Sequence, residues 1–508
     1  MKRNLLALLL LASAPLLASL QGAEDAASST PAATFDITKI RHVVIIYQEN
    51  WSFDGLYGSF PGANGYAFDQ TVHQTDLSNK VVQSLPQALN ADDQGIIFDK
   101  SFPASQPVAR FDMSKYVPES ARTGDIVHRF YTEQLQINSG GMDRYVAWTD
   151  NPGLVTGGFD ATRLPEGMLA RQYVMCDNFF HSAFGGSFLN HQFFVSAQAP
   201  VWPDALKPAN AADFIARAGT PGFVTAASVE AAHGSNLLPV PKVSKNTAGL
   251  AFPNGNNWPA PLGSGSIKFD NHLTVDPDEN GDYHAVNTVQ PSSWPFDLHG
   301  PFLPLLKNPT IGDRLSEASV AWKWYSGGWD QAVAGNPDPN FQEHHQPFNY
   351  YANFAPGTPG RSHLVDLKEL AVDLAGNNLP AVSFVKFQGE LNEHPGYADV
   401  ASGQQATADL VKLIQDSTAW DSTLIIITYD ENGGRWDHAP PPVIDKWGPG
   451  TRVPTILISP FVKRGFVDHT QYETVSILRF IEDRWKLKPL GTRDAGAKSF
   501  TAAFGPAK

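Results

Sequence analysis

The chain has 508 residues, a formal net charge of −14 and 42% hydrophobic residues, so it is long enough to bury a large core. The acidic balance and the lack of an evident basic face argue against nucleic acid as a partner. A single cysteine, Cys176, excludes an intrachain disulfide, and its apolar surroundings in the sequence predict a buried thiol.

The N-terminus has the pattern of an export signal. Lys2 and Arg3 precede an apolar run over 5–20, and polar residues follow at once. The run is short for a membrane-spanning helix, so we expect a signal peptide over 1–23 rather than an anchor. Residues 24–38 then form a flexible mature N-terminus. We therefore predict an exported protein, periplasmic or secreted, with no stable membrane insertion after signal cleavage.

Apolar runs and amphipathic segments alternate along the rest of the chain. Apolar runs predict strands at 42–48, 173–180, 319–325, 379–387, 424–429 and 453–458, and the runs at 42–48 and 424–429 are rich in β-branched residues typical of buried parallel strands. Helical spacing of apolar residues predicts helices at 362–374, 405–415 and 472–485. Asp468 and Thr470 are available as caps for the last of these. Strands that alternate with helices predict an α/β fold, a three-layer αβα sandwich with a largely parallel central sheet.

Residues 200–310 break this alternation, because they are rich in Pro, Asn, Gly and Ser and contain few apolar runs. We interpret them as a loop-rich insertion over the strand ends, with small β elements. The rest of the mature chain, 39–508, is then a single domain around that insertion. A separate domain over 200–310 is the less favoured alternative.

Acidic side chains directly follow two of the predicted strands. Glu49 and Asn50 come after the first strand, and Asp430 and Glu431 come after a strand far along the chain. The carboxyl ends of parallel strands meet at one edge of the sheet, so we expect these side chains to lie close together. Three carboxylates in one place would repel one another, and a bound hard cation is the simplest remedy. Mg²⁺, Ca²⁺ or Mn²⁺ suits oxygen ligands best, with iron or zinc as further options.

Ser187 follows Gly185 and Gly186 at a point where a helix can begin. The glycines allow a ligand to approach the backbone closely, and the start of a helix favours an anion such as phosphate. A serine hydroxyl bound to a metal there could act as a nucleophile. An ordinary helix cap after a glycine turn explains this segment equally well.

Two longer motifs carry a family resemblance. One reads Glu-Asn-Trp-Ser-Phe-Asp-Gly over 49–55, and the other reads Thr-Tyr-Asp-Glu-Asn-Gly-Gly-Arg-Trp-Asp-His over 428–438. Together they resemble the bacterial phosphoesterase family that contains phospholipases C and acid phosphatases, over about 40–481 of this chain. That family is similar in fold to the alkaline phosphatase superfamily. The resemblance therefore implies an alkaline phosphatase-like sandwich and a hydrolase that acts on phosphoric ester bonds.

The resemblance also implies one divalent metal ion and a nucleophile. The implied metal ligands are Glu49, Asn50, Ser187, Asp430 and Glu431. Ser187 would also be the nucleophile, which becomes transiently phosphorylated. Phospholipases C usually carry a Gly-Pro-Thr-like segment followed by Pro-Asn-Arg, whereas this chain has Gly-Gly-Ser followed by Leu-Asn-His over 185–191. The segment is thus closest to the branch of respiratory-burst-inhibiting acid phosphatases.

Histidines supply the remaining candidates. His128 and His394 lie in segments that match the family, and His394 also follows a predicted strand end, so we expect a catalytic role for both. Asn50, His344 and His345 are expected to bind substrate. For any lone histidine, a hydrogen-bonded structural role is the alternative.

The favoured function is an acid phosphatase that acts on small phosphorylated molecules. A histidine acid works best near or below its ordinary pKa of about 6.5, which agrees with an acidic optimum. The alternatives are a phospholipase C that hydrolyses phospholipid head groups, and a non-catalytic exported protein that binds metal at the surface. A sulfatase is disfavoured, because the nucleophile segment lacks the Cys/Ser-x-Pro-x-Arg pattern.

Overall fold

The computed structural model describes residues 35–76, 79–92, 95–203, 275–278, 280, 282–286, 288 and 303–505. Its core is an eight-stranded sheet with the order β13-β12-β14-β1-β15-β16-β8-β17. In that order the strands are Leu364–Asp366, Trp322–Ser326, Val382–Lys386, His42–Gln48, Thr423–Tyr429, Thr455–Ile458, Val174–Cys176 and Phe466–Asp468. Neighbouring strands are parallel except for β16, which is antiparallel to both β15 and β8. This confirms the expected α/β fold with a largely parallel sheet.

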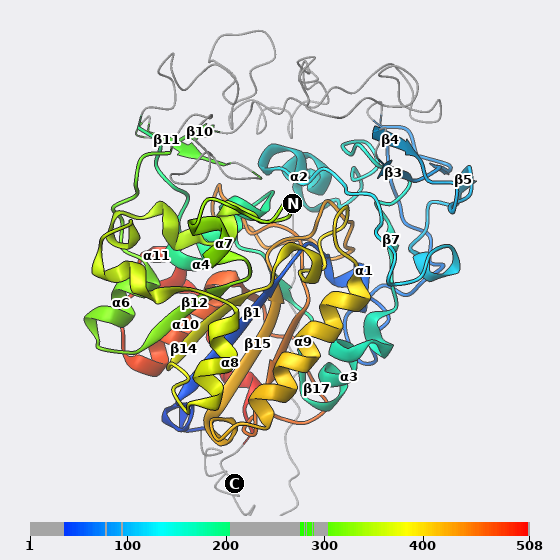
Figure 1. Ribbon diagram of the computed structural model, residues 1–508. Helices are drawn as coiled ribbons and strands as arrows, with labels where there is room; N and C mark the ends of the chain where they lie inside the picture. Colours follow the sequence, from blue (N-terminus) through cyan, green and yellow to red (C-terminus); the bar gives the residue numbers. More distant parts are fainter. Residues whose placement is uncertain are drawn as a thin grey trace, which may run out of the picture.

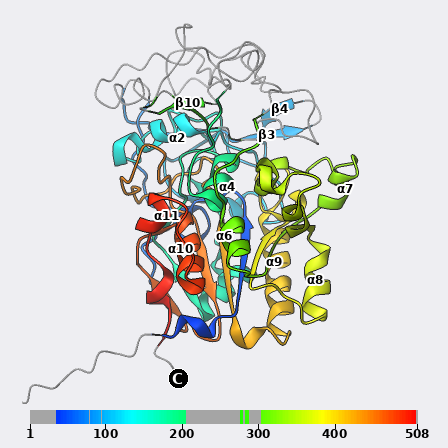
Figure 2. The same cartoon turned by 90° about the vertical axis from the view of Figure 1, so that its left-hand side faces the viewer.

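Helices cover both faces of the sheet, which makes three layers (Figures 1 and 2). One face carries α3 (Pro165–Gln172), α8 (Lys368–Ala375) and α9 (Val400–Gln415). The other carries α4 (Ser187–Ser196), α6 (Ile311–Glu317) and α10 (Thr474–Trp485). All of β15 and six residues of β1 are buried, as expected for central strands between two helical layers.

Shorter elements surround this core, mostly above the carboxyl ends of the strands in Figure 1. The short helices are α1 (Phe53–Tyr57), α2 (Phe130–Ile137), α7 (Trp329–Val333) and α11 (Thr492–Gly496). The short strands are β2 (Leu85–Pro86), β3 (Leu89–Asp92), β4 (Gly95–Phe98), β5 (Ser105–Gln106), β6 (Phe111–Asp112), β7 (Gly157–Gly158), β9 (Phe179–Phe180), β10 (Val275–Pro277), β11 (Tyr283–Ala285) and β18 (Tyr472–Glu473).

Three expected elements have different boundaries in the structure. The segment 362–374 is not one helix, because Leu364–Asp366 pairs with β12 as the edge strand β13 before α8 begins. The expected strand 173–180 is divided into β8 and β9, which pair with different partners. The expected strand 319–325 begins later, because Ser319 has a φ of +56° and forms a turn.

The caps of the last two long helices also differ from expectation. Asp399 caps α9 by accepting a hydrogen bond from Ser402 N, so the helix begins five residues before the expected start at 405. Glu473 caps α10 together with Ser476, in place of the expected Asp468 or Thr470. These caps depend on short strand and turn geometry before each helix, which helical periodicity does not report.

Several expectations fall on the N-terminus and on 200–310. The predicted signal peptide over 1–23 and most of 24–38 lie outside the described residues, as does most of the expected insertion. Within that insertion, β10 and β11 pair as a small antiparallel hairpin, in line with the expected β elements. Cys176 is buried in β8, as predicted. Among the described helices, none combines the length and apolar composition that a membrane crossing requires.

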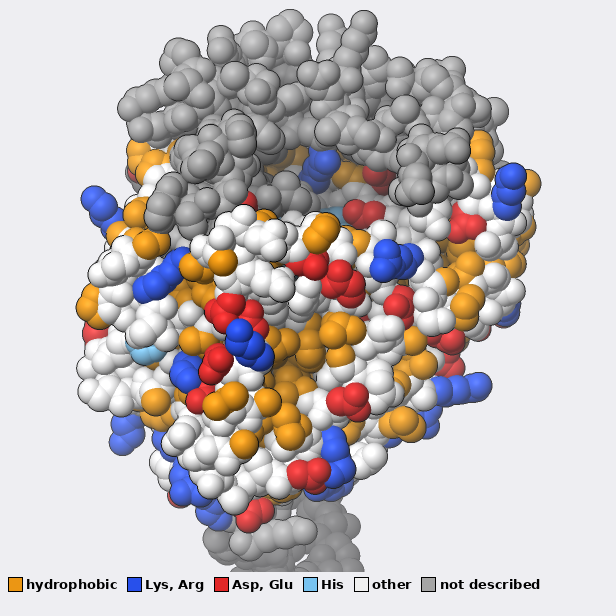
Figure 3. Space-filling view, viewed as in Figure 1, with side chains coloured by type: hydrophobic (Ala, Val, Ile, Leu, Met, Phe, Trp, Pro, Cys, Tyr) orange, Lys and Arg blue, Asp and Glu red, His pale blue; other side chains and the backbone are white. Residues whose placement is uncertain are grey.

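The outer face of α8 and α9 is mixed in character. Acidic and basic side chains are interspersed on the described part of the face seen in Figure 3, with apolar side chains among them. Val372 and Leu413, on α8 and α9, are 61% and 44% exposed. Charges of opposite sign are paired here, as in Lys412 with Asp416.

Candidate functional site

The two carboxylate-bearing segments meet because their strands are paired in register. β1 and β15 are parallel neighbours, and Gln48 lies opposite Tyr429. Glu49 and Asp430 are the next residues along each strand, so both side chains start from the same edge of the sheet. This edge is the carboxyl end of the parallel strands, where ligands of open α/β sheets bind.

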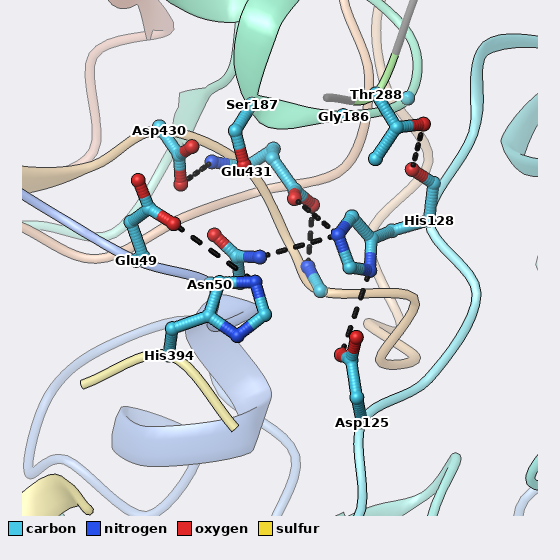
Figure 4. A network of polar contacts seen from close by, with 12 residues as sticks. Glu49, Asn50, Asp125, His128, Gly186, Ser187, Thr288, His394, Asp430 and Glu431 are labelled. Atoms are coloured by element: carbon cyan, nitrogen blue, oxygen red, sulfur yellow. Dashed lines mark hydrogen bonds and ion pairs between the residues drawn. The ribbon is translucent and has the colours of Figure 1, made fainter. Parts of the chain in front are cut away.

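Ser187 reaches this edge at the first position of α4. Gly185 before it has a φ of +81°, and a Cβ there would lie 2.1 Å from Phe130 N, so the turn requires glycine. The Asn190 side chain donates a hydrogen bond to the Gly185 carbonyl at 3.2 Å and thereby braces the turn. Ser187 is buried, and its side chain lies beside the carboxyl group of Asp430 (Figure 4). The serine is thus fixed beside a carboxylate rather than left as a free cap.

Part of the expected insertion contacts the same turn (Figure 4). Thr288 Oγ1 donates to the His128 carbonyl at 3.0 Å, and Phe188 N donates to the Thr288 carbonyl at 2.8 Å. A Cβ on Gly186 would lie 2.3 Å from Thr288 Cγ2. Thr288 therefore packs directly against the turn that carries Ser187.

Glu49, Asp430 and Glu431 form a group of buried carboxylates with unsatisfied oxygens. Oε2 of Glu49, Oδ2 of Asp430 and Oε1 of Glu431 lack a hydrogen-bond partner among the described residues, as does Oδ1 of Asn50. Buried oxygens of this kind need a cation or a proton. Burial and the charge of Glu49 raise the pKa of Asp430 well above its ordinary value, and burial and Asp430 do the same to Glu431. Glu49, Asp430 and His191 offer ligand atoms that lie within 4.8 Å of one another, so these residues could hold a divalent cation, which would take the place of those protons.

Lys386 places a positive charge beside these carboxylates. It is the last residue of β14, the strand next to β1, and it is fully buried. Its Nζ and the Nε2 of His345 each lie 2.6 Å from Oε1 of Glu49. Burial alone would raise the pKa of Glu49, but His345 and Lys386 hold it well below its ordinary value. Three carboxylates and one ammonium group leave a net charge of −2, which one divalent cation would neutralise.

His128 and His394 flank the carboxylates, with ring centroids 5.7 Å apart (Figure 4). His128 Nε2 lies 3.4 Å from Oε1 of Glu431 and 3.4 Å from Nδ2 of Asn50. His394 Nε2 lies 3.9 Å from Oε2 of Glu49. Both Nε2 atoms therefore face the group of carboxylates.

The other nitrogen of each ring is held by the backbone. His128 Nδ1 lies 2.5 Å from the Ile126 carbonyl, and His394 Nδ1 lies 2.5 Å from the Pro395 carbonyl. A carbonyl can only accept a hydrogen bond, so Nδ1 carries the hydrogen in both rings and Nε2 is free to accept or carry a proton. Burial lowers the pKa of His128 from its ordinary value.

Three further histidines pack on the opposite side of Glu49. His344 and His345 lie on a short 3-10 turn, and His191 lies on α4 with its ring stacked on that of His345 at 5.4 Å. His191 Nδ1 is 3.8 Å from Oδ2 of Asp430. Burial lowers the pKa of His345 to about 4 and holds those of His191 and His344 well below their ordinary values. These rings are neutral at neutral pH, the form in which imidazole can bind a metal.

A separate buried group joins the loops that follow β1 and β15. Arg452 Nε donates to Oδ1 of Asp437 at 2.8 Å, and Asp54 N donates to Oδ2 of Asp437 at 3.0 Å. Asp54 in turn lies 2.7 Å from Nδ1 of His438. Arg452 and His438, whose pKa the contact with Asp54 raises, together balance the two acids. We therefore assign this group to the support of the two loops rather than to a second cation.

Every residue that the sequence assigned to the site is buried and lies around this edge: Glu49, Asn50, His128, Ser187, His344, His345, His394, Asp430 and Glu431. Sequence reasoning missed Lys386 and the contact of His191 with Asp430. Lys386 lies within the predicted strand 379–387 near its carboxyl end, and that position was the available signal. His191 follows Ser187 by one helical turn, which is the spacing that brings both to one side of α4.

Comparisons with known proteins identify the family of this chain. Residues 40–488 match the model of the Phosphoesterase family. Phospholipase C B from Mycobacterium tuberculosis is 24% identical over 511 residues, which cover 92% of this chain and 78% of that protein. Non-hemolytic phospholipase C from Burkholderia pseudomallei is 28% identical over 35% of this chain and 32% of its own length. Non-specific phospholipase C6 from Arabidopsis thaliana is 32% identical over 27% and 32%, respectively. The chain thus spans about a third of the last two relatives.

Solved structures similar to this chain include members of the alkaline phosphatase superfamily. A superfamily protein from Vibrio parahaemolyticus is 14% identical with a TM-score of 0.24, over 35% of this chain and 47% of that one. A mutant of the alkaline phosphatase PafA is 9% identical with a TM-score of 0.25, over 74% and 97% of the two chains.

Proposed function

The chain belongs to the phosphoesterase family and is a hydrolase of phosphoric ester bonds, and from this premise we propose that it is a metal-dependent acid phosphatase. Its substrates would be phosphomonoesters of small molecules. The observation that supports this best is the position of Ser187, at the first turn of α4 and beside the carboxyl group of Asp430. The Gly-Gly-Ser segment that carries it is the feature that separates this chain from the phospholipase pattern.

Glu49, Asn50, Ser187, Asp430 and Glu431 would hold one divalent ion. When bound, the ion would neutralise phosphate charge and lower the pKa of the serine hydroxyl. Oxygen ligands favour Mg²⁺, Ca²⁺ or Mn²⁺, and the neutral histidines nearby keep iron or zinc open.

In the proposed reaction, Ser187 Oγ releases its proton to solvent and attacks phosphorus as the ester P–O bond breaks, and the serine regains a proton from solvent after hydrolysis. His394 Nε2 donates its proton to the leaving alkoxide oxygen, which departs as an alcohol. Water then attacks the phosphoserine and releases inorganic phosphate, while His394 recovers a proton. His128, Asn50 and the neighbouring His344 and His345 would orient the phosphate oxygens, since positioning and charge supply most of the catalysis in phosphoryl transfer.

A phospholipase C is the second candidate, and the names of the curated relatives favour it. The two activities differ in whether the substrate is a phosphomonoester or the diester of a phospholipid head group. A non-catalytic exported protein that binds metal would hydrolyse neither. The predicted signal peptide over 1–23 supports export to the periplasm or medium in each case.

A substrate panel across pH tests the proposal. We expect the purified protein to hydrolyse p-nitrophenyl phosphate and sugar phosphates with an acidic optimum, and phosphatidylcholine vesicles much more slowly. The Ser187→Ala variant should retain the fold and lose turnover. Faster release of phosphocholine than of phosphate would establish the phospholipase instead, and full activity of Ser187→Ala would remove the nucleophile assignment.

A further inference from the structure

Glu166 and Glu393 form a buried pair of carboxyl groups beneath the site, and the proposed reaction does not use them. Both side chains are fully buried. The Tyr429 hydroxyl lies 2.8 Å from Oε2 of Glu393 and 3.2 Å from Oε2 of Glu166. Gln48 Nε2 donates to the other oxygen of Glu393 at 3.1 Å. The two carboxyl groups therefore share one hydroxyl between them.

One hydroxyl cannot satisfy two carboxylates. Tyr429 has a single hydrogen, so if it donates to Glu393 its oxygen must accept a hydrogen from Glu166, or the reverse. At least one of the two carboxyl groups then carries a proton. A direct hydrogen bond between the two carboxyl groups requires the same proton.

Among the described residues whose side chains contact the pair, none carries a positive charge. The side chains that face it are neutral and come from β1, β15, α1 and α9: Gln48, Tyr429, Tyr57, Gln404 and Thr407. Two ionised carboxylates would repel one another in such a place. Burial and the proximity of Glu166 raise the pKa of Glu393 well above its ordinary value, and burial raises that of Glu166 to about 7.

The pair connects the segments that carry the site. Gln48 and Tyr429 are the last residues of β1 and β15, directly before the carboxylate-bearing segments. Glu393 directly precedes His394. One carboxyl group thus contacts the ends of both strands and belongs to the turn that presents the histidine.

The backbone at Glu393 is held in a conformation that glutamate rarely adopts. Its φ is +71°, and the Trp51 indole N–H donates to its carbonyl at 3.1 Å. On α9, a Cβ at Gly403 would lie 2.2 Å from Cγ of Glu393, so the helix leaves room for this side chain through a glycine. Such strain persists where surrounding contacts fix the conformation, and here those contacts converge on Glu393.

We propose that Glu393, which shares a proton with Glu166, is a positioning residue that holds His394 at a fixed place relative to the ends of β1 and β15. The neutral carboxyl group accepts from Gln48 and binds Tyr429 without a charge that the interior would have to compensate. This inference rests on the proposed function, because it assigns to His394 the donation of a proton to the leaving group.

The test compares Glu393→Gln and Glu393→Ala on two phosphomonoesters. A carboxamide can replace a neutral carboxyl group as both donor and acceptor, whereas alanine removes the link. Departure of p-nitrophenolate needs little help from an acid, but departure of an alkoxide such as that of glycerol phosphate depends on it. For Glu393→Ala we expect a loss in kcat of about 10²-fold on glycerol phosphate, a much smaller loss on p-nitrophenyl phosphate and little change in KM. Glu393→Gln should recover most of the lost kcat.

Two outcomes would overturn the inference. Equal losses on both substrates would show that Glu393 does not act through His394, and a Gln variant as impaired as the Ala variant would show that the carboxyl group is ionised. If Glu393→Ala does not fold, Glu393→Gln and Glu166→Gln still decide the matter by infrared spectroscopy at neutral pH. Each should weaken a carboxylic-acid C=O band of the wild-type protein, and the lack of any such band would contradict the shared proton.

Two controls separate this inference from the proposed function. His394→Gln should itself lose much more activity on glycerol phosphate than on p-nitrophenyl phosphate. If it does not, the assignment of His394 as the acid fails, whereas the infrared band still tests the pair. Glu482→Gln changes another buried carboxyl group, which lies near Asp494, and should leave the ratio of the two substrates unchanged.

Discussion

Lys386 and Glu49 form a fully buried ion pair, with Nζ of the lysine 2.6 Å from Oε1 of the glutamate. The two residues lie at the ends of the neighbouring parallel strands β14 and β1. The site therefore contains a basic side chain of its own, in addition to any metal. The negative charge of three ionised carboxylates exceeds the positive charge of one divalent ion. Lys386 supplies the remaining positive charge.

Removal of this lysine should destabilise the fold. In Lys386→Met, Glu49 would stay buried with only His345 beside it, and the loss of one partner of a buried pair costs about 3–5 kcal/mol. We expect a fall of that size in the free energy of unfolding, measured by urea denaturation. Lys368→Met is the matched control, because its ion pair with Asp330 is exposed and solvent screens such pairs, so we expect little change in stability. Equal stability of the two variants would mean that the buried pair contributes nothing.

Asp430→Asn should abolish stable metal binding. The substitution keeps the size of the side chain and its hydrogen bonds but removes a negative charge. The carboxylates and Lys386 together would then attract a cation less strongly. We expect at least about a 10-fold loss of metal affinity, read as metal content by elemental analysis after dialysis. Asp373→Asn, on α8 beside Lys323, should retain the wild-type content. Full metal occupancy in Asp430→Asn would exclude Asp430 as a ligand.

Gly185→Ala should separate activity from stability. The added Cβ would lie 2.1 Å from Phe130 N, so the turn before Ser187 must shift, and a displacement of about 1 Å can cost 10²-fold in rate. Gly335→Ala is the matched control, because Gly335 has a similar φ of +79° but nothing lies within 4 Å of the new Cβ. It should lose about 1 kcal/mol of stability and no activity. Comparable rates for the two variants would mean that the glycine turn does not position Ser187.

Glu482 should make stability fall as pH rises. Burial and Asp494 raise its pKa to about 9, so the folded state holds a proton that the unfolded state releases near its ordinary pKa of 4.5. The favourable contribution is complete below the unfolded pKa and is lost progressively as pH rises toward the folded value. Glu482→Gln removes this dependence.

The measurement is the melting temperature of both proteins across that window. Relative to wild type, Glu482→Gln should gain melting temperature between about pH 5 and pH 8. Parallel curves for the two proteins would show that Glu482 is ionised in the folded state.

Much of the site could be predicted because its residues follow recognisable strands. The β-branched runs before Glu49 and Asp430 identify two central strands, and parallel strands present their carboxyl ends at one edge. The glycines before Ser187 mark a turn into a helix, and α4 begins at that serine. Strong local patterns of this kind persist in the fold, since burial and propensity favour the same element.

Other features depend on pairing across the sheet. Leu364–Asp366 has helical neighbours in sequence, yet it forms an edge strand because β12 offers it an unpaired side. A lysine at the end of a strand is usually exposed, but here the layer above the sheet covers Lys386. Glu166 and Glu393 are separated by more than two hundred residues, and no spacing in the chain relates them.

The sequence by itself determined the class of fold, the two strand ends with their carboxylates, and the serine after a glycine turn, because each is a local pattern with a direct physical cause. The tertiary structure decided which charges balance one another: Lys386 against Glu49, and one shared proton between Glu166 and Glu393. Charge balance in a buried site depends on distances between segments that are remote in the chain, and these distances exist only after the sheet has assembled.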